Sequence, residues 1–175
     1  MVVFDSTFLI FLFVPNAPCG TERAKDRIDF LIGDLHGKGE RIRVPAPALS
    51  EILIRTGHST QQIVNELTKS PRFKVEPFDT IAAIETAKIA QQASKRGSKR
   101  GESVDTWAKV KYDRQIVGVA KVLSASTIYS EDEDLRKLAE ANGITAKGIA
   151  DCPLPFNRES SNYQLVNPPN EGSKS

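Results

Sequence analysis

Residues 2–10 have the sequence VVFDSTFLI, in which a short apolar run leads into an aspartate, two hydroxyl residues and a second apolar run. The first run is typical of a short buried strand, and the polar residues with the second run are typical of a capped helix start. A strand that leads directly into a helix predicts an α/β fold with a parallel sheet. Asp5 then lies at the carboxyl edge of that sheet, where the active groups of such folds gather.

The same alternation of strands and helices continues along the chain. Further strands are predicted at residues 41–45, 73–75, 127–129 and 144–146. Helices are predicted from Phe8 onward and at residues 24–32, 48–55, 60–68, 80–93, 110–123 and 135–141. Gly33 is expected to end the second of these helices, before a glycine-rich turn at residues 36–40. Residues 156–175 show no helical period and are expected to form an extended or disordered tail.

The composition excludes several classes of protein. A chain of 175 residues with 39% apolar and 26% charged residues is one ordinary globular domain. Two cysteines, Cys19 and Cys152, cannot build a disulfide framework or a four-thiolate zinc site, which favours a reducing compartment such as the cytoplasm. The longest apolar run, residues 8–14, is far shorter than the roughly 20 residues of a membrane span, and Asp5 interrupts any signal-peptide pattern. No membrane partner is therefore expected.

The formal net charge of +2 conceals two segments of opposite sign. Residues 94–121 carry a net charge of +5, and residues 129–140 carry a net charge of −3. Because a basic segment binds phosphate backbones of any sequence, residues 94–121 predict an RNA-binding arm, with a solvated loop as the alternative. The candidate RNA-binding residues are Lys95, Arg96, Lys99 and Arg100. Trp107 and Tyr112 can stack on bases, although a single tryptophan in an amphipathic stretch is more often part of the core.

Carboxylates follow two of the predicted strands. Asp5 comes directly after the first strand, and the run 130–134 comes directly after the strand at 127–129. Carboxylates at the ends of parallel strands can converge on one crevice and hold a hard divalent cation such as Mg²⁺. Each acid also has a structural interpretation: Asp5 and the acidic run as helix caps, Glu51 as the ion-pair partner of Arg55, and Asp113 as that of Lys109 or Lys111. The spacing alone leaves both interpretations open.

Several segments resemble the motifs of PIN-domain nucleases, in the order in which that family has them. They are VVFDSTFLI (2–10), PAPALSEILIRTG (45–57) and KVKYDRQIVGVAKVLSASTIYSEDEDLRKLAEANGI (109–144), the last of which covers two motifs. The closing GIADCPLP (148–155) also resembles the end of a bacterial and archaeal subgroup that includes VapC-type toxins. The resemblance implies a three-layer α/β/α PIN-like domain with a central parallel sheet over residues 1–155.

The same resemblance implies roles for particular residues. The acids of the family fall on Asp5, Glu51, Asp113 and Asp132, of which Asp5, Asp113 and Asp132 are the expected metal ligands. The supporting positions fall on Thr7, Ser130 and Asp134. Glu131 departs from the pattern, because Asn, Asp or Arg is common there, and Gly118 stands where Ala is usual. A glycine inside a helix costs roughly 0.5–1 kcal/mol, so Gly118 is expected to weaken its helix slightly.

The implied activity is endoribonuclease cleavage that depends on Mg²⁺ or Mn²⁺ and leaves a 5′-phosphate and a 3′-hydroxyl. In such a reaction the cation lowers the pKa of a bound water and polarises the scissile phosphate. For the toxin of a type II toxin–antitoxin pair, the implied partners are an RNA substrate, an antitoxin protein and a second copy of the chain in a homodimer. The alternatives are a PIN-fold RNA- or protein-binding module without catalysis and a housekeeping RNA-processing nuclease without an antitoxin. An aspartate-nucleophile phosphatase is disfavoured, because Thr7 stands where that chemistry needs a second aspartate.

Overall fold

A computed structural model describes residues 1–14, 17–57, 60–95 and 107–154 of the chain. Its centre is a five-stranded sheet in which every strand is parallel to its neighbours. The strands are β1 (Val2–Phe4), β2 (Ile42–Pro45), β3 (Phe73–Glu76), β4 (Thr127–Tyr129) and β5 (Thr145–Lys147). They lie in the order β3-β2-β1-β4-β5. The predicted parallel sheet is confirmed.

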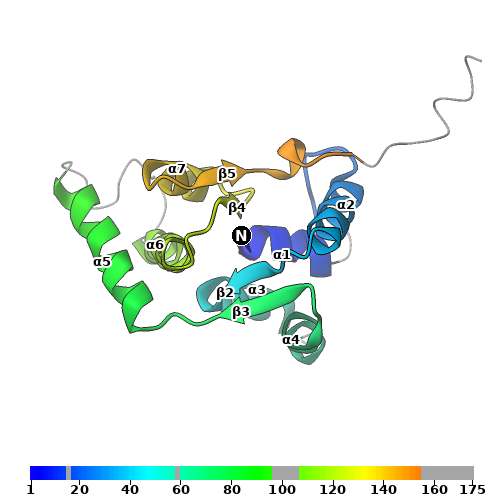
Figure 1. The fold of residues 1–175 in the computed structure, drawn as a ribbon, viewed down its shortest axis with the longest axis horizontal. Helices are drawn as coiled ribbons and strands as arrows, with labels where there is room; N and C mark the ends of the chain where they lie inside the picture. The colour runs from blue at the N-terminus through cyan, green and yellow to red at the C-terminus, as the bar shows by residue number, and fades with distance from the viewer. Residues whose placement is uncertain (15–16, 58–59, 96–106, 155–175) are drawn as a thin grey trace, which may run out of the picture.

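Helices cover both faces of the sheet (Figure 1). One face carries α1 (Ser6–Phe13), α2 (Ala24–Gly37), α3 (Ala46–Thr56) and α4 (Thr60–Lys69). The other face carries α5 (Thr80–Lys95), α6 (Trp107–Val122) and α7 (Glu133–Ala141). A short 3-10 helix, η2 (Ile149–Asp151), follows β5. This is the three-layer α/β/α arrangement predicted from the sequence.

The alternation of side chains along β1 divides the hydrophobic core in two. Val2 and Phe4 pack with α1–α4, whereas Val3 packs with α5–α7. The ring centroid of Phe4 lies 5.1 Å from that of Phe8 and 5.4 Å from that of Tyr129. Because Phe4 and Tyr129 are the last residues of their strands, these packed rings hold the start of α1 against the carboxyl edge of the sheet.

The order in which the chain adds strands to the sheet reverses at β1. The strands β2 and β3 lie on one side of β1, and β4 and β5 lie on the other. In open α/β sheets the crevice at such a switch point is where ligands bind. The register pairs Phe4 with Tyr129, so Asp5 and Ser130 follow their strands at the same level. The main-chain N–H of Asp5 donates to the carbonyl of Tyr129 at 3.2 Å and joins the two strand ends.

The helix predicted at residues 24–32 is longer than expected. It continues through Gly33 and ends at Gly37, so the predicted stop at Gly33 is wrong. Ile32 and Leu35 on either side of Gly33 are both buried, and their burial outweighs the roughly 1 kcal/mol that a mid-helix glycine costs. The chain turns at Gly39 instead, which has a φ of +71° that favours glycine.

Trp107 lies at the start of α6 with 41% of its surface exposed, so its interpretation as a core residue is wrong. The cationic groups of Lys111 and Arg114 lie over its ring, 5.6 and 5.4 Å from the centroid. These residues follow Trp107 by four and seven positions and therefore share one side of the helix. Tyr112 is half-buried. Stacking of bases on either ring remains a prediction.

Some predicted features fall outside the described residues. These are Arg96, Lys99 and Arg100 of the basic segment and the tail at residues 156–175. Lys95 is the last residue of α5. The role of this segment in RNA binding therefore remains a prediction from the sequence. Within the described ranges, none of the helices combines the length and the apolar character needed to cross a bilayer.

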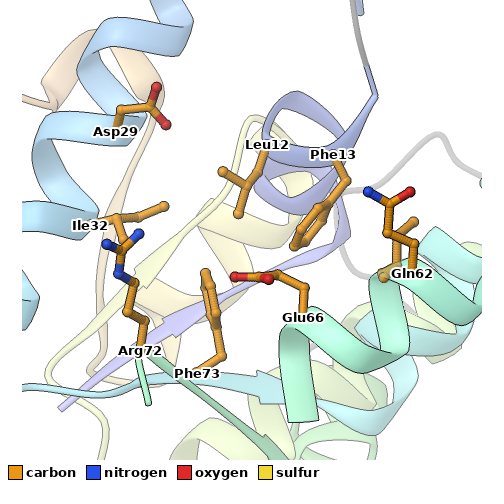
Figure 2. Close-up of a pocket in the computed structure, with 9 residues that line it drawn as sticks. Leu12, Phe13, Asp29, Ile32, Gln62, Glu66, Arg72 and Phe73 are labelled. Atoms are coloured by element: carbon orange, nitrogen blue, oxygen red, sulfur yellow. The ribbon is translucent and has the colours of Figure 1, made fainter. Parts of the chain in front are cut away.

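A pocket of about 510 Å³ opens at the amino edge of the sheet (Figure 2). It lies between α1, α2, α4 and the start of β3, and it is lined by Leu12, Phe13, Asp29, Ile32, Glu66 and Arg72 among others. Phe73, the first residue of β3, also lines it. The pocket is therefore at the opposite end of the strands from Asp5, and none of the predicted site residues borders it.

Candidate active site

Asp5 follows β1 and caps α1 with its carboxylate. Its Oδ1 accepts hydrogen bonds from the main-chain N–H groups of Thr7 and Phe8 at 2.9 and 3.1 Å. This cap lets α1 begin at Ser6, two residues before the helix start predicted at Phe8. Only 1% of Asp5 is exposed. A cap alone does not require a buried carboxylate, which is costly unless it is well paired.

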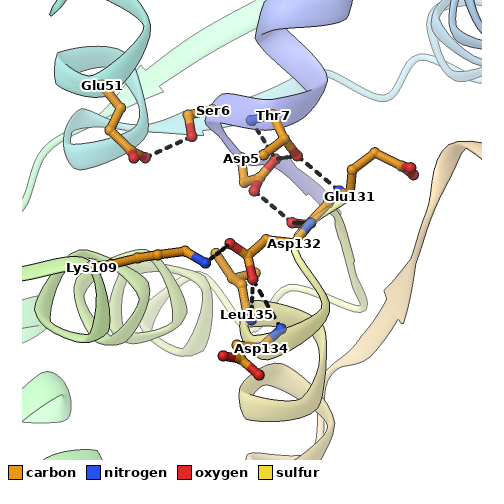
Figure 3. Close-up of polar contacts among 10 residues, drawn as sticks. Asp5, Ser6, Thr7, Glu51, Lys109, Glu131, Asp132, Asp134 and Leu135 are labelled. Carbon is orange, nitrogen blue, oxygen red and sulfur yellow. Dashed lines mark hydrogen bonds and ion pairs between the residues drawn. The ribbon is translucent and has the colours of Figure 1, made fainter. Parts of the chain in front are cut away.

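Two hydroxyl groups fix the carboxylate of Asp5 against the turn after β4 (Figure 3). Thr7 Oγ1 donates to Asp5 Oδ1 at 2.7 Å and accepts from the N–H of Glu131 at 2.8 Å. Ser130 Oγ donates to Asp5 Oδ2 at 2.6 Å and accepts from the N–H of Asp132 at 2.9 Å. Each hydroxyl therefore links Asp5 to the turn after β4, which carries Asp132. The structure brings Thr7 and Ser130 together with Asp5, and their supporting role in a reaction remains a prediction.

Glu51 lies on α3 and is held by a residue that sequence reasoning missed. Ser6 Oγ donates to Glu51 Oε2 at 2.6 Å, and Figure 3 shows Ser6 between Glu51 and Asp5. The alternative partner of Glu51, Arg55, is exposed at the end of the same helix. The available signal for Ser6 was its place beside Asp5 in the only polar stretch between two apolar runs, but that stretch is explained as well by capping.

Asp113 lies on the buried face of α6, with 7% of its surface exposed. Burial raises its pKa to about 8, and the charge of Asp132 acts in the same direction while Lys109 opposes the shift. Glu51 and Asp5 add further contributions that raise the pKa of Asp113. The four acids predicted from the sequence therefore act on one another, although they come from four separate parts of the chain.

The carboxyl group of Asp5 also resists ionisation. Burial raises its pKa to about 6, although the hydrogen bonds from Ser130, Thr7 and Phe8 act in the opposite direction. The charge of Asp132 raises the pKa of Asp5 further. Buried acids with raised pKa values around a shared crevice are characteristic of functional sites, and a bound cation relieves their mutual repulsion.

Asp132 caps α7, and both of its carboxylate oxygens are engaged. Oδ1 accepts hydrogen bonds from the N–H groups of Asp134 and Leu135 at 2.9 and 3.1 Å. Oδ2 lies 2.6 Å from the Nζ of Lys109, which belongs to the first turn of α6 (Figure 3). The sequence suggested Lys109 as a partner of Asp113 on the same helix. Its contact with Asp132 joins separate elements and was not predicted.

The comparison with known proteins agrees with this arrangement. The sequence pattern of the PIN domain matches residues 2–141. The chain belongs to the PIN domain family. The resemblance noted in the sequence is thereby confirmed for the family and for its fold. Among curated proteins, none matches the sequence of this PIN domain.

Solved structures with a similar fold include several complexes. FitAB bound to an IR36 DNA fragment has 17% sequence identity with this chain, and the match covers 87% of this chain and 98% of the other, with a TM-score of 0.59. VapBC2 from Rickettsia felis, bound to a promoter DNA fragment, has 10% sequence identity with this chain. The match covers 85% of this chain and 98% of the other, with a TM-score of 0.60. VapC20 from Mycobacterium tuberculosis has 16% sequence identity with this chain. The match covers 87% of this chain and 100% of the other, with a TM-score of 0.51. At these identities the likeness shows the shared fold.

The donor set of this PIN domain fits a hard divalent cation. Mg²⁺ and Mn²⁺ prefer carboxylate oxygens and keep several waters, so Asp5, Asp113 and Asp132 would suffice to hold one. In the described ranges, no three His, Cys, Asp or Glu side chains are gathered closely enough to hold a metal ion as they stand. The positive charge that lies against Asp132 in this structure is the ammonium of Lys109.

The two remaining positions of the acidic turn behave differently from Asp132. Glu131 Oε1 accepts a hydrogen bond from the N–H of Ile149, so its side chain ties the turn to η2 rather than joining the acids. Asp134 contacts Asp132 through its main-chain N–H, while its carboxylate projects from α7 away from Asp5 (Figure 3). The accessory role of Asp134 remains a prediction.

A second pocket, of about 350 Å³, adjoins the acids of the PIN domain. Thr7, Glu131 and Asp132 form one part of its wall. The remainder comes from Ile10, Phe11, Ala17, Pro18 and Arg55. Apolar and aromatic side chains beside a guanidinium suit the base and the phosphate of a nucleotide, so the surroundings of the acids are chemically suited to a nucleic-acid strand.

Proposed function

We propose that this PIN domain is an endoribonuclease that depends on Mg²⁺ or Mn²⁺ and acts as the toxin of a type II toxin–antitoxin pair. The observation that carries the proposal is the convergence of Asp5, Glu51, Asp113 and Asp132 at the topological switch point of the sheet. The structural neighbour VapC20 is described as a toxin that cleaves the sarcin–ricin loop, which supports RNA as the substrate.

In the proposed phosphodiester hydrolysis, the residues of the site have different roles. A divalent ion held by Asp5, Asp113 and Asp132 would acidify the attacking water and polarise the scissile phosphate. Thr7 and Ser130 hold the carboxylate of Asp5 in place, so it needs little reorganisation during the reaction. The water oxygen bonds to phosphorus, the bond to O3′ breaks, and a proton passes to the leaving oxygen. The products are a 5′-phosphate and a 3′-hydroxyl.

Cleavage of an end-labelled single-stranded RNA tests the assignment of the acids. Asp5→Asn and Asp113→Asn should each reduce the Mg²⁺- or Mn²⁺-dependent rate by roughly 100-fold or more, because each removes a negatively charged oxygen donor from the site. Asparagine keeps the size of the side chain. At position 5 its Oδ1 can still accept from the N–H groups of Thr7 and Phe8, although its amide nitrogen no longer accepts from Ser130 Oγ, so both variants should remain folded. Their thermal unfolding is measured alongside the rates.

Asp29→Asn is the matched control. Asp29 lies on α2 and borders the pocket at the amino edge of the sheet (Figure 2), so its replacement should leave the rate unchanged. Full metal-dependent cleavage by both Asp5→Asn and Asp113→Asn would refute the assigned site. Tight RNA binding by the wild-type chain without cleavage at any Mg²⁺ or Mn²⁺ concentration would instead favour an RNA-binding module.

The proposal extends to protein partners. VapBC2 and FitAB are complexes with a fold similar to that of this chain, and the VapC-type resemblance implies an antitoxin and a homodimer. An antitoxin could silence the enzyme by filling the pocket lined by Phe11, Arg55 and Asp132, because Asp132 borders this pocket. Cleavage in the cytoplasm, where RNA and Mg²⁺ are both abundant, completes the proposal.

A further inference from the structure

Lys109 contacts Asp132 and lies on the same helix as Asp113. Its Nζ lies 2.6 Å from Asp132 Oδ2, and it precedes Asp113 by four residues on α6. Side chains four residues apart share one face of a helix, and the charge of Lys109 lowers the pKa of Asp113. The ammonium of Lys109 therefore forms an ion pair with Asp132 and also acts electrostatically on Asp113, and these two acids come from different elements of the fold.

The geometry of Asp132 makes this ammonium a competitor for a divalent cation. Oδ1 already accepts two main-chain N–H groups at the start of α7, so Oδ2 is the oxygen that remains available to a cation. Oδ2 is the atom that Lys109 contacts. A doubly charged ion at this oxygen repels an ammonium a few ångströms away, so the two cations do not share the position without cost.

We infer that Lys109 is an exchangeable counter-cation, which holds Asp132 until a divalent ion takes Oδ2 and then turns to the RNA backbone. The inference rests on the proposed function for the identity of the metal and the substrate. In this role Lys109 is a positioning residue: it limits repulsion among the acids and delivers its charge to the phosphate when the metal is in place.

Three features of Lys109 suit the second half of this exchange. Its side chain is 38% exposed, whereas that of Asp132 is only 13% exposed, so the ammonium has a path to solvent. The lysine stem is flexible and its ammonium binds phosphate as a point charge. Finally, the pocket beside Asp132 offers room for a nucleotide on the side of the acids. Asp132, which Lys109 contacts, borders this pocket, so a displaced ammonium starts next to the residue that a strand in the pocket would reach.

Calorimetric titration with Mg²⁺, at a pH above the pKa of Asp113, tests the first half of the exchange. Lys109→Met removes the competing charge but keeps the apolar stem, so the Kd for Mg²⁺ should fall by roughly threefold to tenfold. Lys109→Arg keeps the charge and should bind Mg²⁺ as the wild type does. Lys111→Met is the matched control, because Lys111 lies on the same helix over the ring of Trp107, and its Kd should not change.

Binding of single-stranded RNA tests the second half. In EDTA, wild type and Lys109→Met should bind RNA equally, because Lys109 is then occupied by Asp132. With Ca²⁺ in place of Mg²⁺, Lys109→Met should bind RNA roughly twofold to fivefold more weakly than wild type, since one phosphate contact is missing. A purely structural role of Lys109 would weaken metal binding and RNA binding together and would lower the unfolding temperature.

The outcomes separate this inference from the proposed function. If the wild type binds Mg²⁺ but Lys109→Met binds it no more tightly, the exchange is refuted and the proposed function stands. If Lys109→Met weakens RNA binding equally in EDTA and in Ca²⁺, the exchange is also refuted, because the phosphate contact then does not depend on the metal. If the wild type takes up no divalent ion at all, the metal-dependent function fails and the exchange fails with it.

Discussion

Asp113 and Asp5 show how single residues of this site oppose the stability of the fold. Both carboxyl groups are buried, and burial raises the pKa of Asp113 from 3.8 to about 8 and that of Asp5 from 3.8 to about 6. The folded chain therefore keeps these protons over a pH range in which the unfolded chain has released them. Above that range the fold has to hold buried negative charge, which is the condition a divalent cation relieves.

The sign of the pH dependence follows directly. Because the folded state binds more protons than the unfolded state between the ordinary and the raised pKa, the free energy of unfolding decreases as the pH rises from about 4 to about 8. Asp113→Asn removes the larger of these two effects. In EDTA at pH 8, this variant should be more stable than the wild type by about 2–4 kcal/mol, and the difference should vanish near pH 4.

Thermal unfolding over a series of pH values measures this difference. The matched control is Asp29→Asn, which changes an exposed carboxylate on α2 and should leave the pH profile as it is. A wild-type profile that is flat between pH 4 and pH 8 in EDTA would contradict the raised pKa of Asp113.

At the scale of elements, the contact between α5 and α6 explains why glycine occupies position 118 inside a helix. Gly118 is expected from helix propensity alone to weaken α6. A Cβ built at this position would lie 2.2 Å from Thr86 Oγ1 and 3.1 Å from the carbonyl oxygen of Ala82. The glycine therefore allows the two helices to approach closely, and its propensity cost is smaller than the cost of the clash.

Gly118→Ala should therefore destabilise the domain, by about 1–3 kcal/mol, although alanine is the better helix former. Gly33→Ala is the matched control. Gly33 also lies inside a helix, but a Cβ there meets nothing within 4 Å, so this variant should be stabilised by roughly 0.5–1 kcal/mol. Denaturant unfolding of both variants gives the comparison. A stabilised Gly118→Ala would show that α5 moves away without cost.

At the scale of the whole molecule, the net charge of +2 is the sum of two segments that the fold brings into contact. Residues 94–121 carry a net charge of +5 and residues 129–140 a net charge of −3. The ion pair between Lys109 and Asp132 joins them. The described part of the basic segment, residues 107–121, therefore contacts the acidic turn through this ion pair. Guidance of a polyanion by the whole segment remains a prediction.

Salt dependence of RNA binding tests this charge arrangement. Replacing Lys95, Arg96, Lys99 and Arg100 together by glutamine should reduce the slope of log K against log salt concentration by up to about 3, because each phosphate contact on a single strand contributes about 0.7. The loss should be similar for RNAs of different sequence. As a control, the exposed Lys25 of α2 and Lys38, the residue after α2, are replaced by glutamine, and the slope should stay the same. An unchanged slope in the fourfold variant would show that these four residues do not contact the RNA.

The local pattern of the chain determined most of the fold. Apolar runs interrupted by polar caps predicted the five strands and the helices between them, because strand and helix periods are properties of short segments. Asp5 and Asp132 were also visible, since they follow predicted strands, whereas Glu51 and Asp113 were assigned only through the resemblance to PIN-domain motifs. The stop predicted at Gly33 was wrong, because burial of Leu35 on the far side of the glycine outweighs local propensity.

Only the tertiary structure decided how the side chains of the site are paired. The links from Ser6 to Glu51, from Ser130 to Asp5 and from Lys109 to Asp132 join residues that are far apart in the chain. Such contacts depend on strand register and helix packing, which no short segment contains. The sequence by itself determined which groups this protein has and, for Asp5 and the run 130–134, at which edge of the sheet they lie. The packing of α6 beside the turn after β4 determined that a lysine lies against Asp132 in the candidate site.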